Sequence, residues 1–210
     1  MEISFSKDRI IINKKEDELD TFVIDFTSIL NKLDIKYVII SGYVSILFGR
    51  SRLSEDVDIL LEKLSIERFK ELWKNLAEKF ECIISDDPNT AYKDYLLHKL
   101  SIRFSRPKRY VPNMEVGFIS DELDMWTLEN RREAALNGNR IFISRFEIQI
   151  AYKLYLGSEK DIEDARHIYK MFKDRLDMPL LKQFNQKLKI EHMFKEYLEN
   201  EATQSKLKGT

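Results

Sequence analysis

Asp56 and Asp58 are the residues whose type and spacing point most directly to chemistry, in the run DVDILL. Side chains two residues apart on a β-strand point to the same face, with their bases about 6 to 7 Å apart. Two facing carboxylates resist ionisation unless a cation lies between them, and such oxygen ligands suit Mg²⁺ or Mn²⁺. The pair therefore fits a metal platform for phosphoryl or nucleotidyl transfer. An isolated Asp-x-Asp is short and common, so the alternative is an ordinary solvent-facing edge strand.

Residues just before this pair are suited to binding phosphate. Ser41 and Gly42 lie where the apolar run 37–40 turns into a short helix, so their backbone amides can hold the phosphates of a nucleotide. Arg50 and Arg52 can bind a triphosphate through forked, charge-assisted hydrogen bonds. The alternatives are that Gly42 only makes the turn and that the arginines are surface charges.

The stretch VIISGYVSILFGRSRLSEDVDILLE resembles the nucleotidyltransferase superfamily of the DNA polymerase beta type. That pattern has a Gly-Gly or Gly-Ser turn, a short helix and an Asp-x-Asp strand, and the stretch is most similar to the AbiEii-like abortive-infection toxin branch. The resemblance covers residues 36–61 closely and 113–170 loosely. It implies Mg²⁺ or Mn²⁺ as cofactor, a nucleoside triphosphate as substrate, and Glu115 as the third carboxylate, on a neighbouring strand. The alternative for Glu115 is an exposed residue on an alternating strand.

The resemblance also implies nucleotide-binding or catalysis-supporting roles further along the chain, in FEIQIAYKLYLGSEKDIEDARHIY, for Lys153, Lys160, Asp161 and Asp164. Ordinary helix chemistry is the alternative, because carboxylates in a first helical turn and charges four residues apart stabilise a helix. Four positions depart from the family pattern. Ser41 replaces its first glycine, Tyr43 follows Gly42, Ser54 stands at a nucleotide-binding position where threonine is usual, and Glu115 stands where aspartate is usual.

The run RFSRPKRY clusters Arg103, Arg106, Lys108 and Arg109 in a loop that could guide an RNA backbone or a substrate phosphate. A solvated loop is the alternative that the overall charge favours, since 35 Lys and Arg residues face 36 Asp and Glu residues. The three histidines have no metal-ligand spacing and no Ser/His/Asp or Cys/His set can be assembled, so we reject zinc and hydrolase sites.

Hydrophobic periodicity predicts an α/β protein whose small mixed sheet forms a nucleotidyltransferase core flanked by helices over residues 1–142. Strands are expected at 36–40, 56–61 and 113–119, with further ones at 81–85 and 99–105, and helices at 16–33 and 66–80. Residues 143–210 form a helical C-terminal portion packed on the core. Ser65, Ser144 and Ser158 are expected to cap helices, Gly157 to end one, and Pro179 to lie in a first turn.

Composition limits the class of protein. The 210 residues contain 43% hydrophobic and 34% charged residues, which is typical of a globular chain. No apolar run reaches the roughly 20 residues that a membrane span needs, the N-terminus lacks a signal peptide, and the single cysteine suits a reducing compartment. We therefore expect a cytoplasmic protein without a membrane partner.

The function expected from these features is transfer of a nucleoside monophosphate to an acceptor, which can be RNA, a protein or a small molecule. The toxin resemblance adds a role as a toxin-antitoxin component with a cognate antitoxin as partner. The main alternative is a catalytically inactive binding module with the same fold that partners another protein. A structural α/β domain with accidental motif matches is the third possibility.

Overall fold

The structure, a computed structural model, describes residues 1–6, 9–52 and 54–199. Residues 200–210, the end of the expected C-terminal portion, lie outside these ranges. The chain divides into two compact units, one made of Met1–Val44 and Arg52–Ser144 and the other of Ser45–Ser51 and the chain from Arg145 onward. We call them the sheet unit and the helical unit.

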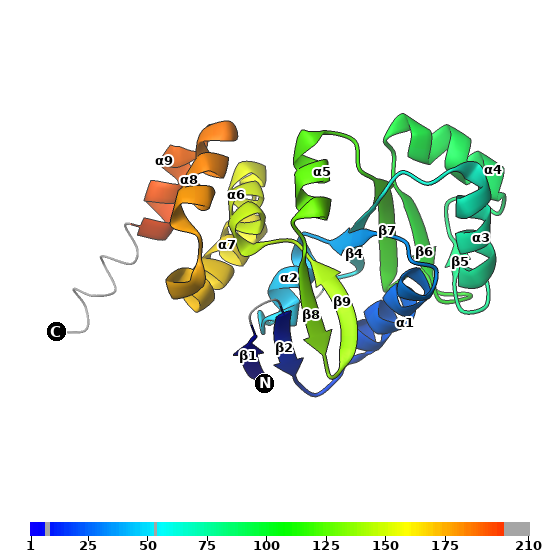
Figure 1. Cartoon of the computed structure of the whole chain (residues 1–210), viewed down its shortest axis with the longest axis horizontal. Helices are drawn as coiled ribbons and strands as arrows, with labels where there is room; N and C mark the ends of the chain where they lie inside the picture. The colour runs from blue at the N-terminus through cyan, green and yellow to red at the C-terminus, as the bar shows by residue number, and fades with distance from the viewer. Residues whose placement is uncertain (7–8, 53, 200–210) are drawn as a thin grey trace. The chain divides into compact units, whose positions relative to one another are not determined.

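The sheet unit is built on one mixed sheet, and the described residues give it nine strands in the order β1-β2-β8-β9-β3-β4-β7-β6-β5 (Figure 1). The pairs β2–β8, β3–β9 and β4–β7 are parallel and the remaining neighbours are antiparallel. This arrangement confirms the predicted mixed α/β class. The strands are β1 (Glu2–Phe5), β2 (Arg9–Asn13), β3 (Tyr37–Ile39), β4 (Asp56–Leu61), β5 (Glu81–Cys82), β6 (Ile102–Ser105), β7 (Asn113–Phe118), β8 (Arg132–Leu136) and β9 (Asn139–Ile143).

Helices of the sheet unit cover the sheet with aromatic side chains. The long α1 (Glu18–Lys32) contacts β9 and α3 (Ile66–Leu76), and the rings of Phe22 and Phe26 pack edge-on against Phe80. As predicted, Ser65 caps α3, since its hydroxyl accepts from the amide of Arg68. The other helical segments are α2 (Gly42–Leu47), which runs on into the helical unit, α4 (Pro88–Thr90), η1 (Ala91–Tyr95), η2 (Leu96–His98) and α5 (Glu122–Glu129).

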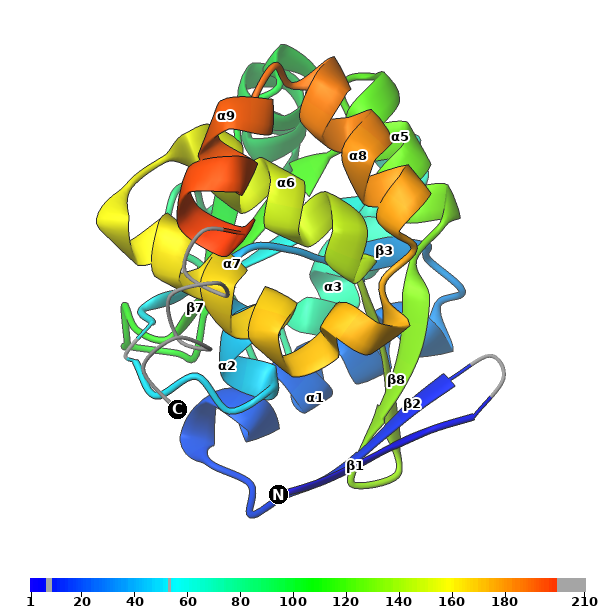
Figure 2. The ribbon, with the colours of Figure 1, turned by 90° about the vertical axis from the view of Figure 1, so that its left-hand side faces the viewer.

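The helical unit packs α6 (Phe146–Leu156) against α7 (Glu159–Phe172) and α8 (Met178–Lys187), as Figure 2 shows. It also contains η3 (Lys173–Arg175), α9 (Glu191–Phe194) and η4 (Lys195–Glu199). The segment 45–51 joins this unit through Phe48, whose ring packs against Phe146 and Phe172. Within the described ranges, each helix is too short or too polar to cross a membrane.

Most local signals at the helix ends of this unit are confirmed, and one is wrong. Gly157 ends α6 with a positive φ of 70°, Ser158 caps α7, and Pro179 lies in the first turn of α8. Ser144 was expected to cap α6, but the cap residue is Arg145 and its side chain makes no capping hydrogen bond. The amide of Ser144 instead donates to the carbonyl of Ile39, so the chain is still paired with the sheet at that point.

Candidate metal and nucleotide site

The site is built on β4, whose side chains alternate as predicted. Val57 is fully buried, whereas Asp56 and Asp58 are partly exposed on the opposite face. Glu115 on the parallel neighbour β7 lies directly opposite Asp58 in register. One carboxylate oxygen from each of Asp56, Asp58 and Glu115 lies within 4.8 Å of the others, so the three side chains form a cluster that could hold a metal ion.

Glu115 is held by Arg103 of β6, which lies opposite it in the antiparallel register. Arg103 Nε and Nη2 both donate to Glu115 Oε2, at 3.0 and 2.7 Å. The hydrogen bonds that Arg103 donates to Glu115 raise the pKa of Arg103, and the negative charges of Glu115, Asp56 and Asp58 add to the effect. The sequence placed Arg103 in the expected strand 99–105 and at the start of the basic run RFSRPKRY, but it did not reveal Glu115 as its partner, because no local pattern shows which strand will pair with which.

The turn at Ser41 and Gly42 begins beside the cluster, because the amide of Ile40 donates to the carbonyl of Asp58 at 3.0 Å. Ser41 has a φ of 61°, in the left-handed region that favours glycine, at the position where the resembling family has glycine. A Cβ added to Gly42 would lie 2.0 Å from Arg52 Nη2. The guanidinium of Arg52 therefore packs directly on Gly42 and occupies the space that the missing side chain leaves.

Ser54 orients the first aspartate. Its hydroxyl lies 3.0 Å from the carbonyl oxygen of Asp56 and 3.4 Å from Asp56 Oδ1, so it can donate to either. The described residues thus gather six of the expected site residues in the sheet unit: Asp56, Asp58, Glu115, Ser41, Gly42 and Ser54, with Arg52 over Gly42 as a seventh.

The other expected nucleotide contacts lie in the helical unit, where they form a network of ion pairs. Lys153 is 3% exposed, and its Nζ lies 2.5 Å from Asp161 Oδ1 and 3.3 Å from Asp164 Oδ2. Arg50 Nε lies 2.6 Å from Asp164 Oδ1. Lys160, in the first turn of α7, is exposed. Asp164 is fully buried, and Lys153 and Arg50 provide the compensating positive charge that a buried carboxylate needs.

The carboxylate of Asp161 is stabilised in its ionised form. Burial alone would raise its pKa, but hydrogen bonds from Lys153 and Ser158, together with the charges of Lys153 and Lys160, outweigh burial and leave the pKa of Asp161 below its usual value. Asp161 therefore has a clear structural role in joining α6 to the start of α7. Its expected nucleotide contact stays a prediction.

The basic loop of β6 and β7 is held to α1 by ion pairs. Arg106 pairs with Asp25 and lies 4.6 Å from the ring centre of Phe80, and Arg109 pairs with Glu18. Paired arginines attract a phosphate less strongly than unpaired ones. The ion pairs give the loop a structural role, and they do not favour the expected guide for an RNA backbone or a substrate phosphate.

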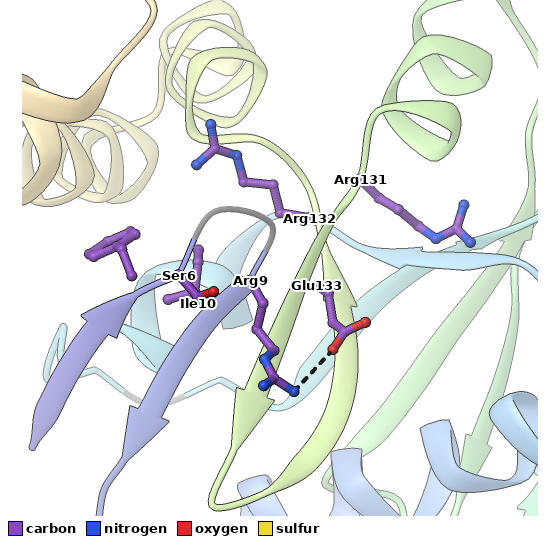
Figure 3. Close-up of a pocket in the computed structure, with 7 residues that line it drawn as sticks. Ser6, Arg9, Ile10, Arg131, Arg132 and Glu133 are labelled. Atoms are coloured by element: carbon purple, nitrogen blue, oxygen red, sulfur yellow. Dashed lines mark ion pairs between the residues drawn. The ribbon is translucent and has the colours of Figure 1, made fainter.

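A further pocket of about 230 Å³ lies beside β2 and β8 (Figure 3). Its arginines do not converge. Arg131 and Arg132 leave the chain in different directions, and Arg9 points to Glu133, with 3.8 Å between the charged atoms. Arg131 also lies 4.6 Å from the ring centre of Phe142. The pocket therefore lacks the convergent donors of an anion site.

Comparison with known proteins identifies the fold. No protein-family model matches the sequence, and no curated protein sequence matches it significantly. Among solved structures, the chain is similar to those of nucleotidyltransferase-like proteins. One is an antigenic nucleotidyltransferase-like protein from Paracoccidioides brasiliensis, with 20% identity, 88% of this chain and 93% of that chain covered, and a TM-score of 0.55.

A second similar structure is that of the antibiotic-resistance factor ANT(2'')-Ia, with 12% identity, 86% of this chain and 97% of that chain covered, and a TM-score of 0.55. At such identities the similarity shows the fold alone. The chain thus has the fold of nucleotidyltransferase-like proteins, as its resemblance to that superfamily predicts.

Proposed function

We propose that the protein is a metal-dependent nucleotidyltransferase, which moves a nucleoside monophosphate from a nucleoside triphosphate to an acceptor hydroxyl. The observation that carries this proposal is the carboxylate cluster of Asp56, Asp58 and Glu115, whose ligand oxygens lie within 4.8 Å of one another beside the turn at Ser41. An all-oxygen, partly exposed donor set fits a hard divalent cation and leaves it open to a substrate.

The three carboxylates would hold Mg²⁺ or Mn²⁺. A cation bound there supplies charge neutralisation for the triphosphate and lowers the pKa of an acceptor hydroxyl. Ser54 keeps Asp56 oriented toward the cluster through its hydroxyl. Arg103 donates two hydrogen bonds to one carboxylate oxygen of Glu115.

The triphosphate binds at the turn in this proposal. The backbone amides of Ser41 and Gly42 and the guanidinium of Arg52, which packs on Gly42, bind the two departing phosphates. The acceptor oxygen forms a bond to the α-phosphorus while the bond from that phosphorus to the α–β bridging oxygen breaks. The hydroxyl proton is released and pyrophosphate leaves.

We further propose that residues 1–142 carry the transfer chemistry and that residues 143–210 contact the nucleotide through Lys153, Lys160 and Asp161. Arg50 is proposed as another nucleotide contact. Lys153 can reach a phosphate only by exchanging a carboxylate partner, because two aspartates engage its Nζ. Exposed Lys160 has no such requirement. Among these residues, Lys160 is therefore the more direct candidate for a phosphate contact.

The acceptor is RNA, a protein or a small molecule in this proposal. We also propose that the protein is a toxin whose partner is a cognate antitoxin, which the resemblance of residues 36–61 to the AbiEii-like branch supports.

The test is incubation of the protein with each α-labelled nucleoside triphosphate, Mg²⁺ or Mn²⁺, and RNA, protein or small-molecule acceptors. Release of pyrophosphate and label on one acceptor are expected, and both should be lost in Asp58→Asn. The matched control is Asp94→Asn, which changes an exposed aspartate on η1. Calorimetry separates this proposal from the alternative, because a catalytically inactive module that only partners another protein should show no metal-dependent heat of nucleotide binding. Absence of that heat would overturn the proposed transferase and support the binding module.

A further inference from the structure

We propose that Arg103 is a built-in counter-cation of the carboxylate cluster. The guanidinium of Arg103 competes with the divalent cation for Glu115 and so lowers the affinity of the site for that cation. This inference rests on the proposed metal site. It concerns how tightly that site binds the divalent cation and not which reaction follows.

The position of Arg103 is fixed by the sheet. It lies opposite Glu115 in the β6–β7 register, and Glu115 lies opposite Asp58 in the β7–β4 register, so the three residues form one row across neighbouring strands. Both hydrogen bonds from Arg103 end on Glu115 Oε2, at 3.0 and 2.7 Å. The charges of Asp56 and Asp58 also stabilise the guanidinium.

These contacts have opposite consequences in the two states of the site. Without metal, three carboxylates repel one another, and the single positive charge of Arg103 offsets part of that repulsion. With a divalent cation in the cluster, the guanidinium faces a like charge and shares an acceptor with it. Removing the charge of Arg103 should therefore destabilise the metal-free protein and strengthen its binding of metal.

An ordinary cross-strand ion pair would behave differently, and the chain offers a matched one. Arg9 of β2 lies opposite Glu133 of β8 and forms an ion pair with it (Figure 3). Their side chains are 51% and 30% exposed, against 46% and 25% for Arg103 and Glu115. Loss of such a pair costs little stability and has no reason to change metal binding. Arg9→Gln is therefore the control for Arg103→Gln.

The experiment is a Mn²⁺ titration of the chelator-treated protein, with free Mn²⁺ followed by electron paramagnetic resonance. Arg103→Gln should bind Mn²⁺ about fivefold more tightly than the parent, which is the order expected for a partly exposed charge near a divalent ion. Arg103→Lys, which keeps the charge, should stay within about twofold of the parent, as should Arg9→Gln. Because exposed charges are screened by salt, the gain in Arg103→Gln should shrink as ionic strength rises.

A second measurement needs no metal. The melting temperature of chelator-treated Arg103→Gln should fall below that of Arg9→Gln, since only the former removes a cation that is hydrogen-bonded to the carboxylate cluster. Mn²⁺ binding by Arg103→Gln that equals or is weaker than that of the parent would overturn the inference. If the parent shows no Mn²⁺ binding that Asp58→Asn removes, the proposed metal site itself is wrong, which is a different result from failure of the Arg103 variants alone.

Discussion

Replacing Asp58 by Asn should raise the stability of the metal-free protein while removing its response to metal. The ligand oxygens of Asp56, Asp58 and Glu115 lie within 4.8 Å of one another. Two unit charges at that separation repel by about 0.9 kcal/mol in water, and by more where the site is partly buried. The variant removes two such repulsions, and against them it removes the attraction of Asp58 to nearby cations such as Arg103. The net gain is about 1 kcal/mol, or roughly 2 to 4 °C in melting temperature for a chain of this size.

The assay compares thermal unfolding of the parent and of Asp58→Asn, first with a chelator and then with Mg²⁺ and a nucleoside triphosphate. A ligand that binds only the native state stabilises it, so the parent should melt at a higher temperature in the second condition. The variant should show little or no such increase. Asp94→Asn, which changes an exposed aspartate outside the cluster, should respond to the ligands as the parent does.

The opposite pattern would refute this reasoning. A structural aspartate accepts hydrogen bonds that stabilise the native state. Loss of such a carboxylate usually lowers the free energy of unfolding by roughly 1 to 3 kcal/mol. If Asp58→Asn melts several degrees lower than the parent and is still stabilised by Mg²⁺ with nucleotide, then Asp58 supports the fold and does not bind the metal.

Three other substitutions test single features of the structure. Ser41→Gly should raise the free energy of unfolding by about 0.5 to 1 kcal/mol in urea, because a φ of 61° is strained for serine; a decrease would show that the serine side chain outweighs the strain. Gly42→Ala should weaken binding of nucleoside triphosphate in calorimetry, because the new Cβ displaces the guanidinium of Arg52; unchanged affinity would remove Arg52 from the phosphate site. The lowered pKa of Asp161 means that its ion pair with Lys153 stabilises the protein above the usual aspartate pKa of about 4 and is lost as pH falls through the lowered pKa. Asp161→Asn should therefore be less stable than the parent at neutral pH and approach it in acid, and a deficit that stayed constant down to pH 2 would contradict the assignment.

The sequence by itself determined the features that depend on neighbouring residues. Side chains alternate along any strand, so Asp56 and Asp58 had to share one face and Val57 had to face the core. Gly157 at the end of α6 and Ser158 at the start of α7 act through backbone groups a few residues away, and their roles could be predicted for that reason. Glu115 was found through resemblance to a family and not through any local pattern.

Local preference failed where tertiary pairing overrides it. The run REAAL contains good helix formers, yet it forms β8 because β2 and β9 pair with it on both sides. Ser144 was read as a helix cap, but its amide is still bonded to the sheet. In both cases one partner is distant in sequence, namely β2 for β8 and Ile39 for Ser144.

Only the tertiary structure decided which charges meet. The row of Asp58, Glu115 and Arg103 exists because β4, β7 and β6 are neighbours in a fixed register. That register is set because the apolar side chains of each strand must all face the core. Lys153 faces two aspartates because α6 and α7 pack against each other. A sequence specifies the types and local directions of its side chains, whereas the distances between them depend on how the whole core packs.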